Sequence, residues 1–212
     1  MLIAGIEAGN EVVLPTGKSR CFVVAAVGHE ELRRNGVDLK SFVETDEQFK
    51  ERVQFIHSSH DCDVIAEEYI EGRELYVSVL GNHKLDVFPI RELVFKEVPP
   101  DEPKIATYRA KWDEEYRKKW GLQNQFAEGL DPALAKAIVQ TCKRIYRLLT
   151  IDGYARVDLR VTPANEIYFI EANPNPHLAA DEDFAQSANK AGLAYSQLIE
   201  RIIRTGMKTV RE

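Results

Sequence analysis

The spacing of apolar residues along the chain predicts three helical stretches. Residues 41–59 carry apolar side chains near helical spacing, and Thr45 is placed to cap that helix. A second helix is predicted to begin at Asp131-Pro132, because aspartate caps helices and proline suits the first helical position. Its apolar face comprises Leu134, Ile138, Cys142, Ile145 and Leu149. The tail from 181 to 206 is predicted to be mostly helical.

Short β-type runs predict strands elsewhere. Residues 2–27 contain such runs, interrupted by glycine and proline, which is typical of two or three small strands. A strand is predicted at 63–70 and a hairpin at 74–90. A second hairpin joins 153–161 to 166–174 through the turn-forming sequence Thr-Pro-Ala-Asn. This order of elements favours an α+β fold with antiparallel hairpins over a regular βαβ alternation.

Composition and charge narrow the classes of function. The chain has 212 residues, 44% hydrophobic and 29% charged, which is typical of a globular protein with a buried core. A net charge of -6 argues against a partner with a dense phosphate charge such as duplex nucleic acid. The three cysteines are scattered and form no CxxC pair, so neither a disulfide framework nor a zinc site is indicated. No apolar run approaches about 18 residues, and we expect a cytoplasmic protein without a membrane segment.

Polar side chains gather in the hairpin at 153–174. Because side chains alternate between the two faces of a strand, Arg156 and Asp158 share one face of the first strand. By the same count, Glu171 and Asn173 share a face of the second strand with Phe169. If the hairpin pairs its polar faces, the two carboxylates and the amide converge with the arginine beside them.

Such a group has the chemistry of a metal and phosphate site. Carboxylate and amide oxygens are hard ligands that suit Mg²⁺ or Mn²⁺, and an arginine can stabilise the charge of a phosphoryl group. Any one of these residues also fits a solvent-facing position of an ordinary hairpin. Their convergence, followed by Pro174 and Pro176, which fix the backbone behind the Asn173 amide, favours a functional site.

Two motifs carry a resemblance to a known family. RVDLRV followed by EIYFIEANPNP, together with VIAEEYIEGRELYVSVLGN, resembles the ATP-grasp ligases, and most closely their D-alanine–D-alanine ligase-like branch. The resemblance runs from about Glu44 to the end of the chain. It implies an ATP-grasp fold, in which two α+β subdomains with antiparallel sheets grip ATP between them. We expect these subdomains at 1–70 and 71–212.

The resemblance also implies roles for individual residues. Asp158, Glu171 and Asn173 match the magnesium ligands of the family, and Arg156 matches the arginine that contacts the transferred phosphate and the acyl phosphate. Lys111, in the segment TYRAKW, matches a lysine on the γ-phosphate. It lies in a polar region, 99–121, that is predicted to be a loop that becomes helical.

The segment AEEYIEGRE matches the nucleotide-binding hinge of the family. Glu67 matches the residue that meets the adenine amino group, and Glu68, Tyr69 and Ile70 match the hinge whose backbone reads the adenine edge. Glu74 matches the carboxylate that holds the ribose hydroxyls. Taken alone, the same segment would be an acidic strand end followed by a turn.

The activity implied by this resemblance is ATP- and Mg²⁺-dependent ligation of a carboxylate and an amine through an acyl phosphate. The first part of the chain departs from the family, which places a lysine after an apolar strand and a glycine-rich loop behind it. The matching positions here are Ala25 or Ala26, and the loop keeps only Gly28 and Gly36. We also expect no counterpart of the family's additional amino-terminal domain in this sequence. Two alternatives therefore stay open: the chain is an enzyme, alone or with a partner chain that supplies that domain, or it is a truncated or degenerate module that binds nucleotide or a partner protein without full catalysis. The resemblance also implies a possible homodimer, since related ligases are often dimers.

Overall fold

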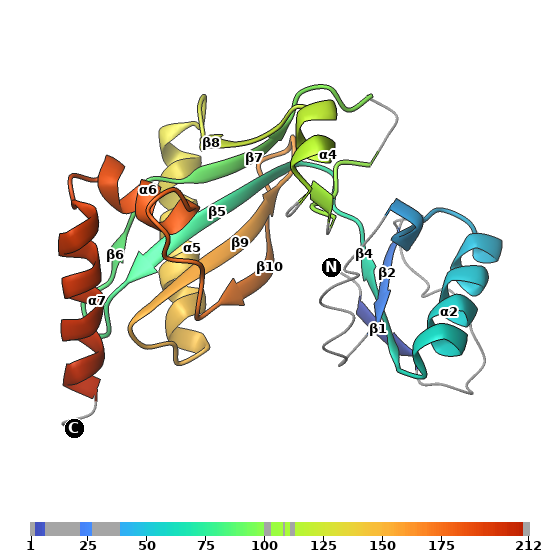
Figure 1. Cartoon of the computed structure of the whole chain (residues 1–212), viewed down its shortest axis with the longest axis horizontal. Coiled ribbons are helices and arrows are strands. Elements are labelled where there is room, and N and C mark those ends of the chain that lie inside the picture. Colours follow the sequence, from blue (N-terminus) through green and yellow to red (C-terminus); the bar gives the residue numbers. More distant parts are fainter. Residues whose placement is uncertain are drawn as a thin grey trace. The chain divides into compact units, whose positions relative to one another are not determined.

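The computed structural model describes residues 3–6, 22–26, 39–99, 103–107, 109–110 and 113–209. The chain divides into two compact units, drawn in Figure 1. The first unit is Met1–Ile70 with Phe95–Leu122, and the second is Glu71–Val94 with Gln123–Glu212. One boundary therefore lies after Ile70. The segment Phe95–Leu122 belongs to the first unit, whereas the subdomain expected at 71–212 includes it.

The first unit contains a four-stranded antiparallel sheet in the order β1-β4-β2-β3. Its elements are β1 (Ile3–Ile6), β2 (Phe22–Ala26), η1 (Leu39–Ser41), β3 (Phe42–Val43), α2 (Asp46–His60) and β4 (Val64–Glu68). Helix α2 packs its apolar side on this sheet, and the shared core includes Phe22, Val24, Phe49, Val53, Ile56 and Val64. The predicted helix and the strand at 63–70 are confirmed.

Helix α2 begins with a reciprocal capping box. The Gln48 backbone N–H donates to Thr45 Oγ1 at 3.2 Å, and the Thr45 N–H donates to Gln48 Oε1 at 3.3 Å. Two of the backbone donors that a helix start leaves unpaired are thereby satisfied. The predicted cap at Thr45 is confirmed.

Replacing Thr45 with alanine is expected to lower the free energy of unfolding by about 1 kcal/mol, because the first turn of α2 loses its acceptor. Urea denaturation followed by circular dichroism measures this change. Thr45→Ser keeps the hydroxyl and serves as the matched control. Equal stabilities of the alanine and serine variants would contradict the role of the cap.

A larger antiparallel sheet carries the chemistry of the second unit. Its strands are ordered β10-β9-β5-β7-β8, and a short β6 also pairs with β5. The elements are β5 (Arg73–Leu80), β6 (Asp86–Val87), β7 (Arg91–Phe95), β8 (Leu122–Phe126), α5 (Pro132–Leu148), β9 (Tyr154–Val161), β10 (Ile167–Asn173), α6 (Asp183–Lys190) and α7 (Tyr195–Thr209). A short helix, α4 (Glu114–Lys119), precedes β8. Both predicted hairpins are confirmed, whereas β7 and β8 were not predicted.

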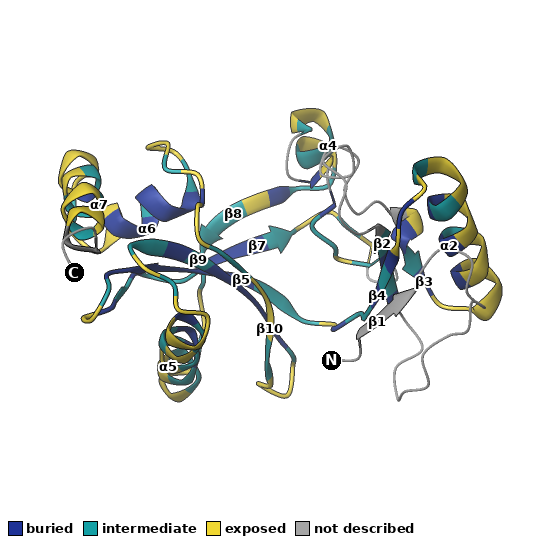
Figure 2. Ribbon diagram, turned by 90° about the horizontal axis from the view of Figure 1, so that it is seen from below, coloured by how far each residue is buried: buried dark blue, intermediate teal, exposed yellow. Residues whose placement is uncertain are grey.

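Helices cover the two faces of this sheet unequally. Figure 2 shows α5 against one face, and α6 and α7 toward one end of the other face. The α5 side is a continuous apolar core that includes Leu75, Val77, Ile138, Val157 and Leu159. On the opposite face, α6 and α7 pack around Leu80, Phe88, Phe184 and Leu198. Leu149, expected on the apolar face of α5, lies directly after the helix and is 50% exposed.

Cys142 lies in the α5 core and is fully buried. Burial, with a smaller contribution from the charge of Asp158, raises the pKa of the Cys142 thiol to about 12. Because the thiolate is the reactive form, the folded protein should not be alkylated at Cys142 near pH 8. Iodoacetamide labelling and peptide mass spectrometry, with and without urea, test this. Rapid labelling of Cys142 without urea would contradict the buried position.

Within the part of the chain that the structure describes, no helix has the length and apolar character that crossing a bilayer requires.

Candidate functional site

The hairpin of β9 and β10 brings the predicted metal ligands to one face of the sheet. Glu171 lies opposite Asp158, and Asn173 lies opposite Arg156. The ladder shifts between Phe169 and Glu171, where an extra residue enters β10 as a β-bulge. Phe169 therefore lies opposite Leu159, on the α5 face, and the expectation that it shares a face with Glu171 is wrong. A two-residue period cannot be counted across an inserted residue.

Arg156 and Asp158 form a bidentate ion pair on β9. Arg156 Nε and Nη2 donate to the two oxygens of Asp158, each at 2.8 Å. The side chains are 20% and 8% exposed, so the pair is largely withdrawn from water. Burial raises the pKa of Asp158 to about 7, against the lowering effect of the Arg156 hydrogen bonds, and the Glu171 charge raises it further. This face therefore holds a buried carboxyl group beside a fixed guanidinium.

The loop behind Asn173 is fixed by side-chain hydrogen bonds. The Asn175 N–H donates to Asn173 Oδ1 at 2.9 Å, and the Tyr154 hydroxyl donates to Asn175 Oδ1 at 2.9 Å. Pro174 and Pro176 restrict the same backbone. The Asn173 oxygen is held in place, and its second lone pair remains able to bind a cation.

The donor set fits a hard divalent cation. Asp158 is buried, Asn173 is half-buried and Glu171 is exposed, so the set extends from the sheet interior to solvent. Mg²⁺ commonly takes one or two carboxylates and keeps its other positions for water and phosphate oxygens. No cluster of three or more His, Cys, Asp or Glu residues suited to a metal occurs among the described residues. Two carboxylates and one amide therefore favour Mg²⁺ over a zinc-type site.

Glu74, the predicted ribose carboxylate, lies on β5, on the same face of the sheet as Asp158. In the sheet register it is opposite Arg160, and Tyr76 is opposite Asp158. Arg160 Nη2 donates to Glu74 Oε2 at 2.9 Å, and the Tyr76 hydroxyl donates to Glu74 Oε1 at 2.7 Å. Just before Glu74, Gly72 has φ 155, and a Cβ there would lie 2.3 Å from the Val161 carbonyl oxygen. Only glycine lets the chain pass β9 so closely.

A second buried ion pair anchors the helix that follows the candidate site. Arg91 Nε donates to Asp183 Oδ1 at 2.9 Å, and Asn124 Nδ2 donates to Asp183 Oδ2 at 2.6 Å. The Arg91 guanidinium also lies 4.6 Å from the centre of the Phe126 ring. Asp183 is the first residue of α6, so the segment between β10 and α6 is held at both ends. No sequence pattern pointed to this pair or to Tyr76. Tyr76 lies two residues after Glu74, however, and strand alternation alone puts both side chains on the same face.

The predicted adenine-reading residues lie at the end of a central strand of the first unit and directly after it. Glu67 and Glu68 close β4, which pairs with β1 and β2. The Tyr69 ring meets Phe42 edge-on, with 5.1 Å between ring centres, and Ile70 is buried. The Lys104 N–H donates to the Tyr69 hydroxyl at 3.2 Å, which ties the hinge to the segment Phe95–Leu122.

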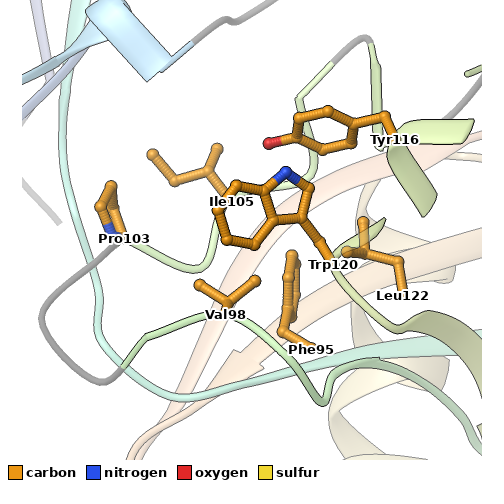
Figure 3. Close-up of a pocket in the computed structure, with 7 residues that line it drawn as sticks. All are labelled: Phe95, Val98, Pro103, Ile105, Tyr116, Trp120 and Leu122. Atoms are coloured by element: carbon orange, nitrogen blue, oxygen red, sulfur yellow. The ribbon is translucent and has the colours of Figure 1, made fainter. Parts of the chain in front are cut away.

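That segment holds a group of half-buried aromatic side chains (Figure 3). The indole of Trp120 lies between Tyr116 and Phe95. The cavity beside these rings is about 20 Å³, lined by Phe95, Val98, Pro103, Ile105, Tyr116, Trp120 and Leu122. Such a volume holds no more than a water molecule, so the rings serve packing rather than ligand binding.

The remaining predicted positions are only partly described. Lys111 lies outside the described residues, as do Gly28 and Gly36. Ala25 and Ala26 end β2, opposite Ile65 and Val64 of β4.

Comparison with known proteins identifies the family. The sequence profile described as "D-ala D-ala ligase C-terminus" matches residues 37–204. An uncharacterised protein of Sinorhizobium fredii is 30% identical over 156 residues, which is 74% of this chain and 44% of that protein. A D-alanine–D-alanine ligase of Carboxydothermus hydrogenoformans is 30% identical over 150 residues, which is 70% of this chain and 44% of that ligase. The chain thus spans less than half the length of these two relatives.

The comparison with solved structures agrees with this family relationship. A crystal structure of D-alanine–D-alanine ligase from Bacillus anthracis complexed with ATP superposes with a TM-score of 0.70 at 19% sequence identity. The match covers 98% of this chain and 60% of that one. The chain therefore belongs to the family of D-alanine–D-alanine ligase C-terminal domains and has the ATP-grasp fold.

Proposed function

We propose that this chain is the nucleotide- and metal-binding part of an ATP-dependent carboxylate–amine ligase. The observation that carries the proposal is the convergence of Arg156, Asp158, Glu171 and Asn173 on one face of the sheet. An ordinary solvent-facing hairpin does not require a buried carboxylate, an exposed one and a tethered amide in register. The family relationship supports ATP as the nucleotide.

In this proposal Asp158, Glu171 and Asn173 hold one or two Mg²⁺ (or Mn²⁺) ions. Bound there, the metal would neutralise charge on the phosphate oxygens of ATP. The chain's own contribution is a fixed electrostatic environment. Arg156 presents a guanidinium, held by Asp158, that can stabilise the charge of the transferred phosphoryl group. Lys111 is proposed to contact the γ-phosphate from the segment after β7.

The reaction would have two steps. A substrate carboxylate oxygen attacks the γ-phosphorus of ATP, which gives an acyl phosphate and releases ADP. An amine nitrogen then attacks the acyl carbon, the bond to the phosphate oxygen breaks, and an amide, inorganic phosphate and a proton are formed. Positioning and charge stabilisation supply most of the catalysis in phosphoryl transfer, which fits a site built from carboxylates, an amide and an arginine.

The nucleotide would be recognised by two segments that are close together in the sequence. Glu67 would accept from the adenine amino group, and the backbone of 68–70 (Glu68, Tyr69 and Ile70) would read the adenine edge. Glu74 would accept from the ribose hydroxyls, since a carboxylate is acceptor-only and each oxygen keeps a free lone pair beside its present donor.

The substrates proposed are a small carboxylate and a small amine of the amino-acid class. This choice rests on the printed activity of relatives such as the Carboxydothermus hydrogenoformans D-alanine–D-alanine ligase. We further propose that a partner chain contributes substrate contacts and, as a separate proposal, that the chain forms a homodimer.

A screen for ADP release tests the proposed activity. The purified protein is incubated with ATP, Mg²⁺ and pairs of amino acids, beginning with D-alanine alone, and ADP is measured by a coupled assay. The proposal predicts release that depends on Mg²⁺ and on both substrates, and amide formation by mass spectrometry. ATP binding without ADP release under any pair would contradict the ligase assignment and favour the second candidate.

The second candidate is an ATP-grasp module that binds nucleotide or a partner protein without completing catalysis. The observation that favours it lies in β2, which ends in Ala25 and Ala26 where related ligases place a phosphate-binding lysine. Losing such a charge-assisted contact costs very roughly 1.5–3 kcal/mol of nucleotide binding. The intact group around Arg156 favours the enzyme.

A further inference from the structure

Tyr76 lies on the face of the larger sheet that carries Glu74, Arg156 and Asp158. It lies on β5, opposite Asp158 of β9 and opposite Arg91 of β7, and it is 5% exposed. Its side chain shares a face with Glu74, two residues earlier in the strand. The residue thus stands between the proposed nucleotide carboxylate and the proposed phosphate arginine.

The hydroxyl of Tyr76 fixes one oxygen of Glu74. It donates to Glu74 Oε1 at 2.7 Å, while Arg160 Nη2 holds Glu74 Oε2 at 2.9 Å. Burial, with the neighbouring negative charges of Glu74 and Asp158, raises the pKa of Tyr76 well above its ordinary value. The phenol therefore keeps its proton and remains a donor. With each oxygen held by one donor, Glu74 has a single orientation in which its other lone pairs are free.

The ring of Tyr76 supports Arg156. The Arg156 guanidinium carbon lies 4.6 Å from the ring centre, which is within the range of a cation–π contact. The same guanidinium is bound at both Asp158 oxygens. Stacking on one side and a bidentate ion pair on the other leave it little rotational freedom.

We infer that Tyr76 is a positioning residue that orients Glu74 for ribose recognition through its hydroxyl and Arg156 for contact with the γ-phosphate through its ring. This inference rests on the proposed nucleotide site. The two halves of the side chain act separately, so a substitution that removes only one of them should change only one property of nucleotide binding.

Two variants separate those halves. Tyr76→Phe removes the hydroxyl and keeps the ring under Arg156, whereas Tyr76→Leu removes both. Tyr146→Phe is the matched control, because Tyr146 is a buried tyrosine of α5 whose hydroxyl has no hydrogen-bond partner among the described residues. The melting temperature of each variant reports whether it folds. If Tyr76→Leu does not fold, Tyr76→Phe alone still tests the role of the hydroxyl.

The readout is a pair of affinity ratios measured by calorimetry with Mg²⁺, which need no turnover. The ratio of ATP to 2′-deoxy-ATP reports the ribose contact of Glu74, and the ratio of ATP to ADP reports the γ-phosphate contact of Arg156. Tyr76→Phe should lower the first ratio by roughly two- to tenfold and leave the second unchanged. Tyr76→Leu should lower both, and Tyr146→Phe neither.

The outcomes distinguish this inference from the function on which it rests. If the wild type binds ATP and both ratios stay at the wild-type value in folded Tyr76→Phe and Tyr76→Leu, Tyr76 is only a core aromatic and the inference is overturned. A parallel loss of affinity for all three nucleotides would overturn it as well. A wild type that binds none of them overturns the proposed function, and this inference with it.

Discussion

Replacing Glu171 with glutamine is expected to reduce Mg²⁺-dependent ADP release by roughly 10²-fold or more, without loss of the fold. Glu171 is exposed at the bulged edge strand β10, opposite Asp158, and its side chain packs in neither apolar core of the second unit. Glutamine keeps the shape but loses the charge that a divalent cation requires. The free energy of unfolding should therefore change by no more than about 0.5 kcal/mol.

Glu166→Gln is the matched control, because Glu166 is also exposed and belongs to the turn of the same hairpin. It should release ADP at the wild-type rate. Coupled-assay rates and urea denaturation are measured on both variants. Wild-type ADP release by Glu171→Gln would remove Glu171 from the metal site, and equal losses in both variants would indicate a general effect of charge.

Replacing Asp183 with alanine is expected to lower the free energy of unfolding by about 3–5 kcal/mol. The Asp183 side chain is 6% exposed and that of Arg91 is 10% exposed, so the substitution leaves a buried guanidinium without its counter-ion. Asn124 also loses its acceptor. Such a loss is a large part of the roughly 5–15 kcal/mol that stabilises a typical domain.

Two further variants test this explanation. Asp181→Ala removes an exposed carboxylate two residues earlier and should change stability by less than about 0.5 kcal/mol. The double variant Arg91→Met with Asp183→Leu removes both charges and should recover most of the loss, because an apolar pair needs no counter-ion. Urea denaturation monitored by circular dichroism gives all three values. A double variant as unstable as Asp183→Ala would show that the ion pair is not the cause.

Much of the fold could be predicted because local signals agree with it. The Thr45 cap marks the start of α2, and Asp131-Pro132 marks that of α5. The β9–β10 hairpin follows from its alternation and turn residues, and the ATP-grasp resemblance is confirmed by the matched profile. The strands β7 and β8 were missed since charged and amide residues interrupt them, among them Arg91 and Asn124. Those residues are polar because they bind Asp183, far away in sequence.

The candidate site could be proposed from residue types in the sequence, whereas its geometry could not. The residue types around Asp158 indicate a metal site. The bulge that places Glu171 opposite Asp158 could not be predicted, because strand alternation in the sequence does not show where an extra residue is inserted. The contacts of Tyr76 depend on neighbouring strands and on β5 register, which no local pattern specifies. The roles assigned to these residues stay predictions: metal binding by Asp158, Glu171 and Asn173, nucleotide recognition by Glu67, Glu68, Tyr69, Ile70 and Glu74, and phosphate contact by Arg156 and Lys111.

The most direct test of the account is a calorimetric titration of the wild-type chain with ATP, with and without Mg²⁺, repeated on Asp158→Asn. We expect saturable binding that Mg²⁺ strengthens in the wild type, and binding to Asp158→Asn that Mg²⁺ strengthens little, because the buried carboxylate opposite Glu171 is gone. Absence of ATP binding at millimolar concentration, or an equal effect of Mg²⁺ on both proteins, would contradict a nucleotide and metal site on this face of the sheet.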